Sequence, residues 1–332
     1  MKRKLKAQIF LAILILPAIL TPTLIGKANA NGEEKPIIVC TTNVLGSIVK
    51  QYVGNQADVV VLVNPGLCPA DYDMKPSDLY AISKAKVLFY HKIQGEYWLN
   101  NTIEASGNTN ITRIMISGPW NTPEGAKKYI KWIGGNLSQI LGIDFTEKMN
   151  SMLSEIDTAA GSIQSMAQSL DVQSVNVICM LWQKQFVSWV GFNVTATYPP
   201  GQLSASDIEN LVQTAKEKDV ALIIDNLQSG TEVGEALSEE CDAVHVVLTN
   251  FPEAIPNTAT LAEMMEYNAN QLFDALEKWK STSELRSEAS TSSELKSEVS
   301  TLRTQLMIFQ IVAVIAIVLA VVEAVLLYVK RR

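Results

Sequence analysis

The chain has 332 residues, of which 48% are hydrophobic and 18% are charged, and its formal net charge is −7. A compact domain usually holds about 100–200 residues, so the length predicts two domains. The acidic balance argues against binding to nucleic-acid phosphates, and four cysteines in a chain of this size do not make a disulfide scaffold.

The first 30 residues have the pattern of a secretory signal peptide. They carry five basic side chains and no acidic one, so the net charge of the remainder falls to −12. A basic start is followed by an apolar run, and Ala28-Asn29-Ala30 fits the small-x-small rule for cleavage. The alternative is an uncleaved membrane helix, but Pro17 and Pro22 interrupt the apolar run.

Residues 31–142 are predicted to form a first α/β lobe. Short β-branched runs alternate there with segments of helical periodicity. Strands are expected at 36–40, 57–63 and 87–90, with helices between them at 45–53 and 77–84. Because strands that alternate with helices are joined by crossovers, the sheet is expected to be parallel.

A long segment with few helix breakers, residues 145–170, is predicted to join this lobe to a second one. The linking helix is assigned to 143–172 and the second lobe to 173–280. In the second lobe, strands are expected at 175–180, 221–225 and 244–248. Helices are expected at 206–218, 232–240 and 261–279. The predicted fold class is therefore α/β, with two lobes of mainly parallel sheets and a ligand cleft between their strands' carboxyl ends.

A stalk rich in serine and glutamate is predicted at residues 281–305. It contains a ten-residue repeat, and Leu295, Val299, Leu302 and Leu306 have the four-three-four spacing of a short coiled coil. Two interpretations remain open at this stage. Either the stalk associates weakly with a second copy of itself, or it is a monomeric and half-ordered spacer.

Residues 306–329 are long and apolar enough to form a transmembrane anchor. The basic tail at 330–332 then lies in the cytoplasm by the positive-inside rule, so the folded part faces outside the cell as a single-pass membrane protein. Glu323 is interpreted either as an acid tolerated near the interface or as a contact with another membrane helix.

Several strings in the two predicted lobes match a known pattern when taken together. The loop at 63–78 reads VNPGLCPADYDMKPSD, and further strings lie at 96–99, 120–123, 186–192 and 216–220. In this order and spacing they resemble the zinc- and manganese-type solute-binding proteins of ABC importers, the ZnuA- and TroA-like group. The resemblance implies two rigid lobes that hold a ligand between them and pass it to a permease.

The histidines with which that family binds metal are replaced in this chain. The positions that the resemblance assigns to the four metal ligands hold Ala70, Gly118, Met180 and Thr249. The chain has two histidines, His91 and His245, and neither falls on these positions. Each is interpreted as a structural histidine, with a ligand role as the alternative, and a His-rich zinc site cannot be built.

Sulfur and carboxylate side chains are the candidate replacements. Thiolate and thioether are soft ligands, suited to a thiophilic transition metal or to a complex of one. The candidate metal ligands are Cys68, Cys179, Met180 and Asp225. The alternative is that Cys40 and Cys179 are small buried hydrophobic residues, and a Cys40–Cys68 disulfide is a third interpretation.

An organic or metal-complexed ligand is the other option for the cleft. Trp120, Trp182, Tyr72 and Tyr198 could line an apolar cleft, with core packing as the alternative for each of them. The sequence has no glycine-rich phosphate loop, no nucleophile elbow and no histidine placed to activate a nucleophile. No catalytic residue is therefore assigned, and the chain is not predicted to be an enzyme.

These observations give one predicted function and one alternative. The predicted function is a membrane-anchored, extracytoplasmic solute-binding protein that delivers a metal ion, or a metal-containing or small ligand, to an ABC importer. Its expected partners are an ABC permease subunit and the lipid bilayer. The alternative is a degenerate member of the fold that acts as a binding, sensory or scaffold module at the cell surface. The candidate ligand-binding residues are Cys40, Cys68, Asp71, Trp120, Cys179, Met180, Trp182, Asp225 and Thr249.

Overall fold

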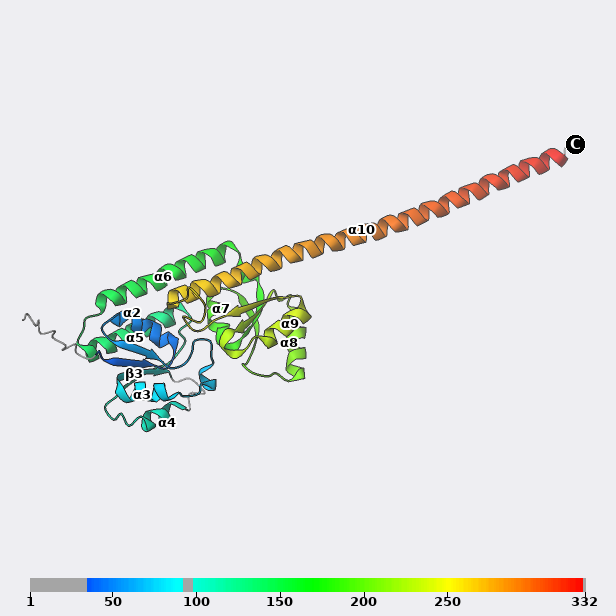
Figure 1. Cartoon of the computed structure of the whole chain (residues 1–332). Coiled ribbons are helices and arrows are strands. Elements are labelled where there is room, and N and C mark those ends of the chain that lie inside the picture. Colours follow the sequence, from blue (N-terminus) through cyan, green and yellow to red (C-terminus); the bar gives the residue numbers. More distant parts are fainter. Residues whose placement is uncertain (1–34, 92–97, 331–332) are drawn as a thin grey trace, which may run out of the picture.

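The computed structural model describes residues 35–91 and 98–330, and Figure 1 shows them as two α/β lobes followed by one long helix. The expected signal peptide at 1–30 lies outside the described residues. Each lobe contains one four-stranded parallel sheet. The predicted fold class, two α/β lobes with parallel sheets joined by a long helix, is confirmed.

The first sheet has the strand order β2-β1-β3-β4. Its central strand is the apolar run Ile-Ile-Val-Cys, as expected of a strand that is covered on both faces. The strands are β1 (Ile37–Cys40), β2 (Asp58–Val61), β3 (Ala85–His91) and β4 (Thr112–Ile116). The helices are α2 (Asn43–Val53), α3 (Pro76–Lys84), α4 (Trp98–Ala105) and α5 (Pro123–Leu141).

The second sheet repeats this topology in the order β6-β5-β7-β8. Its strands are β5 (Asn176–Met180), β6 (Asn193–Tyr198), β7 (Leu222–Asn226) and β8 (Val244–Leu248). Its helices are α7 (Lys184–Val190), α8 (Ala205–Glu217) and α9 (Glu232–Cys241), together with the first turns of α10 (Leu261–Lys330). In both sheets the second strand lies on one side of the first strand and the third strand lies on the other side. Open α/β sheets bind ligands at such a topological switch point.

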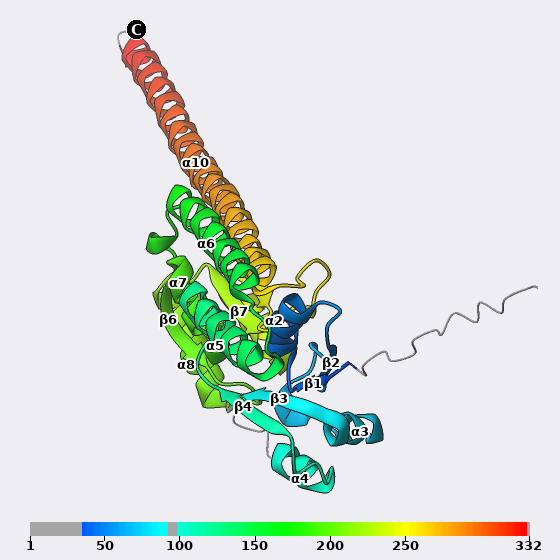
Figure 2. The same ribbon diagram turned by 90° about the vertical axis from the view of Figure 1, so that its left-hand side faces the viewer.

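Helices cover both faces of each sheet, and this arrangement divides the core into three clusters. The outer faces pack against α3 and α4 in the first lobe and against α8 and α9 in the second. The inner faces share one continuous apolar cluster, to which α2, α5, α6 (Thr146–Ser169), α7 and α10 contribute. Figure 2 shows α6 lying alongside the start of α10 above both lobes.

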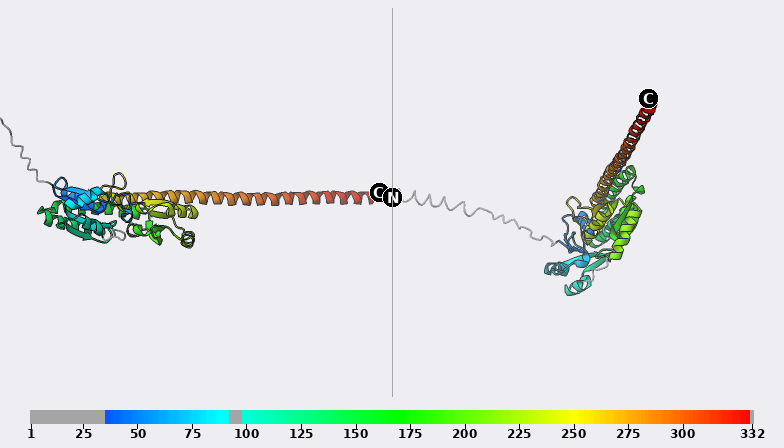
Figure 3. Two further views of the ribbon diagram at one scale, coloured as in Figure 1. Left: turned by 60° about the horizontal axis from the view of Figure 1, so that its bottom comes forward. Right: turned by 90° about the vertical axis from the view of Figure 1, so that its right-hand side faces the viewer.

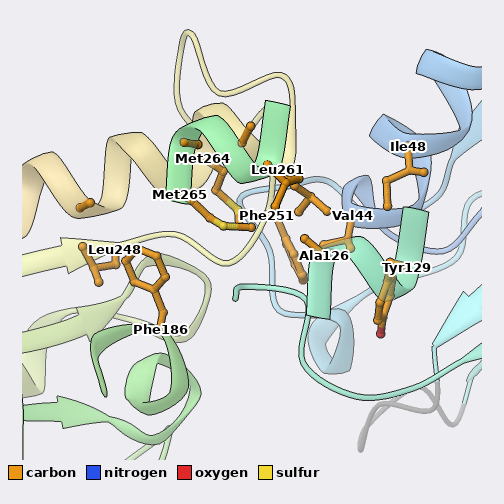
Figure 4. Packing of buried hydrophobic residues seen from close by; sticks show 14 of the residues in the cluster. Val44, Ile48, Ala126, Tyr129, Phe186, Leu248, Phe251, Leu261, Met264 and Met265 are labelled. Atoms are coloured by element: carbon orange, nitrogen blue, oxygen red, sulfur yellow. The ribbon is translucent and has the colours of Figure 1, made fainter. Parts of the chain in front are cut away.

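The shared cluster joins the lobes to each other. Figure 4 shows Met264, Met265 and Phe251 of the second lobe near Val44 and Ala126 of the first lobe. Outside this cluster, the Lys50 ammonium forms a salt bridge of 2.8 Å with the Glu253 carboxylate across the lobes. A continuous core of this kind favours small adjustments between the lobes over a wide hinge motion.

Helix α10 continues well beyond the globular part of the molecule (Figure 3). Its first turns contact β8 and α6, and the Lys280 ammonium donates a hydrogen bond of 2.9 Å to the Leu170 carbonyl. The predicted last helix at 261–279, the stalk at 281–305 and the apolar segment at 306–329 belong to this one helix. At 1.5 Å per residue, the part at 281–305 is about 37 Å long.

Sequence patterns found the four central strands and the edge strands β2 and β8, and they missed the other two edge strands and three helices. The edge strands β4 and β6, the short helices α4 and α7 and the 19-residue helix α5 were not predicted. Helix α5 contains the pair Gly134-Gly135, which lowers its helix propensity, and its burial in the shared cluster compensates for that.

Candidate functional site

A cleft of about 570 Å³ lies between the two lobes. In the first lobe its lining follows the carboxyl ends of β3 and β4, and in the second lobe it follows β5, β7 and β8. Cys68 and Pro69, from the loop after β2, complete the side that belongs to the first lobe. The cleft therefore occupies the edge at which parallel α/β sheets bind ligands.

Aromatic side chains make up much of the lining. The ring centroid of Trp120 lies 4.9 Å from that of His91 and 6.1 Å from those of Tyr129 and Phe251. In the second lobe, Trp182 follows β5 in the sequence, lines the cleft and is 45% exposed. Such a lining suits a ligand with a flat apolar part, since aromatic rings offer large contact areas to it.

The loop that carries Trp120 is fixed by the first turn of α5. A Cβ atom at Gly125 would lie 2.2 Å from the Pro119 carbonyl oxygen, so the loop can pack this closely only against a glycine. The Thr122 hydroxyl caps the same turn by accepting a hydrogen bond of 3.3 Å from the Gly125 amide. Trp120 and Asn121 are thereby held at the cleft.

Three buried amide side chains, Asn121, Gln228 and Asn250, form hydrogen bonds between the lobes, and we call them the amide bridge. The Asn121 amide donates to the Asn250 side-chain oxygen at 3.0 Å and to the Trp182 carbonyl at 3.1 Å. The Gln228 amide donates to the Pro65 carbonyl at 2.9 Å and accepts from the Asn250 backbone amide at 3.1 Å. The lobes are thus tied together at the cleft by neutral groups.

His91 is part of the lining, but both of its ring nitrogens are engaged. The Tyr129 hydroxyl donates to the Gly118 carbonyl at 3.0 Å, so it accepts from His91 Nδ1 at 3.2 Å. The other nitrogen, Nε2, then accepts from the Thr42 hydroxyl at 2.7 Å. Burial lowers the pKa of His91 to about 3, so the ring is neutral and has no lone pair left for a metal.

The charge of the lining is low. Among the described residues around the cleft, Lys184 is the one charged side chain, and no carboxylate lines it. Zinc is bound in proteins by thiolates, imidazoles and carboxylates. Of these ligands, the described lining offers a half-buried thiol at Cys68 and the imidazole of His91, whose nitrogens are already hydrogen-bonded, and this is too few for a zinc site.

Of the predicted ligand-binding residues, Cys68, Trp120 and Trp182 line the cleft. Asp71 is exposed on the loop surface, and the Thr249 hydroxyl is buried in hydrogen bonds with Gln228 and Phe251. The two other aromatic candidates, Tyr72 and Tyr198, are buried in the outer cores of their lobes.

The structure does not bring the four candidate metal ligands together. Consecutive residues of a strand point to opposite faces, so Cys179 lies in the inner core while Met180 lies in the outer one. Burial raises the pKa of the Cys179 thiol to about 12. The part of the chain that the structure describes contains no group of three or more His, Cys, Asp or Glu placed to hold a metal ion. The predicted soft-metal site at Cys68, Cys179, Met180 and Asp225 is therefore not formed.

Cys40 also lies in the inner core, and burial raises the pKa of its thiol. Cys40 and Cys68 are both free, so the disulfide considered from the sequence is not formed in the structure.

Asp225 belongs to a separate buried cluster in the second lobe. Its carboxylate accepts a hydrogen bond of 2.5 Å from the Tyr198 hydroxyl and lies 2.8 Å from His245 Nε2. A Cβ atom at Gly234 would lie 2.1 Å from the same carboxylate, so this turn of α9 needs a glycine. The cluster fastens β7 to β6, β8 and α9, and it is not part of the cleft.

The amide bridge was not predicted from the sequence. Asn121 follows Trp120 directly, and Asn250 is one residue beyond Thr249, the position chosen from the resemblance. Taking the position one residue later would have found Asn250. Gln228, by contrast, gives no signal in the sequence, because its partners Pro65 and Thr249 are distant from it along the chain.

The fold and the cleft define a class of two-lobed α/β binding proteins. The Mn-bound periplasmic metal-binding protein from Candidatus Liberibacter asiaticus has a similar structure, with a TM-score of 0.63, 14% sequence identity, and coverage of 73% of this chain and 100% of that chain. A crystal structure of ZnuA gives a TM-score of 0.62 with 18% identity, over 73% of this chain and 100% of that chain. At these identities the likeness shows the fold alone.

The family profile described as "Zinc-uptake complex component A periplasmic" matches residues 38–275, and the chain belongs to this family. A relative, the manganese ABC transporter substrate-binding lipoprotein PsaA of Streptococcus mitis, is 28% identical over 105 residues, which is 30% of this chain and 33% of that protein. The manganese-binding lipoprotein MntA of Halalkalibacterium halodurans is 27% identical over 77 residues, or 23% and 26% of the two chains. The match thus spans a third or less of these relatives' length.

Proposed function

We propose that this chain is a membrane-anchored, extracytoplasmic solute-binding protein that holds a small organic or metal-complexed solute in the cleft and delivers it to an ABC importer. Membership of the ZnuA family and the names of its relatives support the transport role. One observation supports this class of ligand: the lining of the cleft combines aromatic rings with neutral amides.

The lining selects against a bare divalent cation and in favour of a larger solute. A free metal ion would find no carboxylate among the described lining residues, and the nitrogens of His91 are already committed. A cleft of about 570 Å³ lies within the range of roughly 300–1,000 Å³ that small-molecule sites occupy. Lys184 is the one charged side chain among the described lining residues, and it is positive, so we expect the solute to be neutral or anionic.

The choice between a bare cation and a larger solute can be tested with the cation alone. A ligand at a hundredfold excess over its Kd stabilises a protein by about 2.7 kcal/mol, which raises the Tm of a domain of this size by about 5–10 °C. We expect MnCl₂ and ZnCl₂ to leave the Tm of the full-length chain unchanged. Stoichiometric binding of either ion with a rise of this size would overturn the choice of ligand.

Membrane anchoring rests on the second half of α10. The stretch Glu294–Leu327 contains a window that is long and apolar enough to cross a membrane, and none of that window is buried inside the molecule. Basic residues follow at 330–332, which by the positive-inside rule leaves both lobes outside the cell. We expect the chain to stay in the membrane fraction after extraction with alkaline carbonate. Release into the soluble fraction would contradict the anchor.

The partnership with an importer follows from the family. We expect genes for a permease and an ATPase beside the gene for this chain, and co-purification of the permease with the full-length chain from membranes. A chain that acts as a scaffold would have neither.

A further inference from the structure

An exposed apolar seam runs along α10 from the stalk to the first residue of the proposed anchor. It consists of Leu295, Val299, Leu302 and Leu306, and we call it the stalk seam. These four side chains are between 44% and 61% exposed, although each is apolar. They lie on the part of the helix that projects away from both lobes (Figure 3). Apolar residues in a row on a projecting helix indicate a surface that another molecule covers.

The spacing of the stalk seam continues without a break into the apolar half of the helix. Steps of four and three residues alternate from Leu295 to Leu327. The further positions are Phe309, Ala313, Ala316, Ala320, Glu323 and Leu327. A seam with this period of 3.5 residues is the pattern of a left-handed coiled coil. The register is therefore the same on both sides of the predicted membrane boundary.

Charges beside the stalk seam complement a second copy of the same helix. In a parallel coiled coil, a residue at heptad position g of one helix faces the residue at position e of the partner helix, five places further along the sequence. Here these residues are Glu298 and Arg303, and both are exposed. In a symmetric dimer, Glu298 of each helix faces Arg303 of the other, so the pair occurs twice. The neighbouring pairs at this spacing, Thr291 with Lys296 and Gln305 with Gln310, contain no like charges.

We propose that two copies of this chain associate through α10 as a parallel, two-stranded coiled coil along the stalk seam. A β-branched residue at one core position, Val299, with leucines at the flanking ones, Leu295 and Leu302, favours two strands. The proposed membrane anchor supplies the common orientation, and to that extent this inference rests on the proposed function. The cleft does not take part in the pairing, so the two proposals fail separately.

Pairing also gives the acid in the apolar segment a protein environment. Glu323 occupies a core position of the same register, so its carboxyl group turns from lipid toward the partner helix. Ala313, Ala316 and Ala320 are the preceding core positions, and small side chains there let two helices approach closely within a bilayer.

The proposal is tested by the mass of the full-length chain in detergent, measured by sedimentation. We expect two copies for the natural chain. The Glu298→Arg variant replaces two attractive pairs by two repulsive ones and should raise the dimer Kd about tenfold. The double variant Glu298→Arg, Arg303→Glu restores opposite charges and should restore the dimer. Ser297→Arg places an arginine on the outer side of the helix and should change nothing.

Cross-linking checks the register independently of the charges. With Cys68 and Cys241 replaced by serine, Leu302→Cys at a core position should form an intermolecular disulfide in membranes, whereas Thr304→Cys on the outer side should not. The proposal is overturned if the natural chain sediments as one copy, if the double charge exchange fails to reverse the single one, or if both cysteines cross-link equally. Release from membranes by carbonate would instead contradict the anchor.

Discussion

His91 should make the stability of the first lobe depend on pH. Its imidazole is buried between Thr42 and Tyr129, and burial lowers its pKa from an ordinary value of 6.5 to about 3. The unfolded chain therefore binds this proton more tightly than the folded chain does. The contribution of the neutral His91 to the free energy of unfolding is complete above about pH 6.5, and it is lost as the pH falls toward 3.

The size of the effect follows from the two pKa values. One pKa unit corresponds to about 1.4 kcal/mol, so between pH 7 and pH 5 the free energy of unfolding should fall by about 2 kcal/mol because of His91 alone. Other groups also titrate in this range. A His91→Gln variant keeps a hydrogen-bonding side chain that does not titrate, and it therefore isolates the contribution of the imidazole.

The assay is urea unfolding of the full-length chain in detergent, followed by tryptophan fluorescence at pH 7, 6 and 5. At pH 7 the variant should be less stable than the natural chain, because it loses a well-packed ring. The difference between them should shrink by about 2 kcal/mol at pH 5. A difference that stays constant from pH 7 to pH 5 would refute a buried, neutral His91.

Further predictions concern glycine and cysteine positions. Gly234→Ala should lower the free energy of unfolding by about 2 kcal/mol or more, because its Cβ atom would lie 2.1 Å from the Asp225 carboxylate. Gly135 is a helical position with nothing within 4 Å of its Cβ, so Gly135→Ala should instead raise the free energy of unfolding by up to about 1 kcal/mol. Mass spectrometry after alkylation of the native chain should find Cys68 modified and Cys179 protected, since burial keeps the latter as a thiol of raised pKa. Equal modification of the two cysteines would contradict the packing of β5.

The architecture could be predicted from the sequence because its central strands are continuous apolar runs. The central strands β1, β3, β5 and β7 were found within a few residues, and the apolar edge strand Val244–Leu248 was found at its observed boundaries. The edge strand Asn193–Tyr198 is mostly half-buried and partly polar, so its pattern is weak. The long linking helix was found because it contains few breakers, although tertiary packing decides where it ends.

The cleft could be located from the sequence, but its chemistry could not. The position at the strand ends follows from the parallel topology, and Trp120 and Trp182 lie there as expected. The error about Cys179 and Met180 came from treating neighbours in a strand as neighbours in space, whereas the alternation of a strand separates them. The amide bridge depends on contacts between Asn121 and Asn250, which no local pattern reveals.

The proposal that the cleft carries a small organic or metal-complexed solute is tested by native mass spectrometry with elemental analysis of the full-length chain, purified without chelators. We expect a bound molecule of a few hundred daltons, retained by the Trp132→Ala variant, whose tryptophan is exposed on α5, and lost by Trp182→Ala in the cleft. One bare divalent ion per chain, with no organic mass and no difference between the two variants, would contradict the claim.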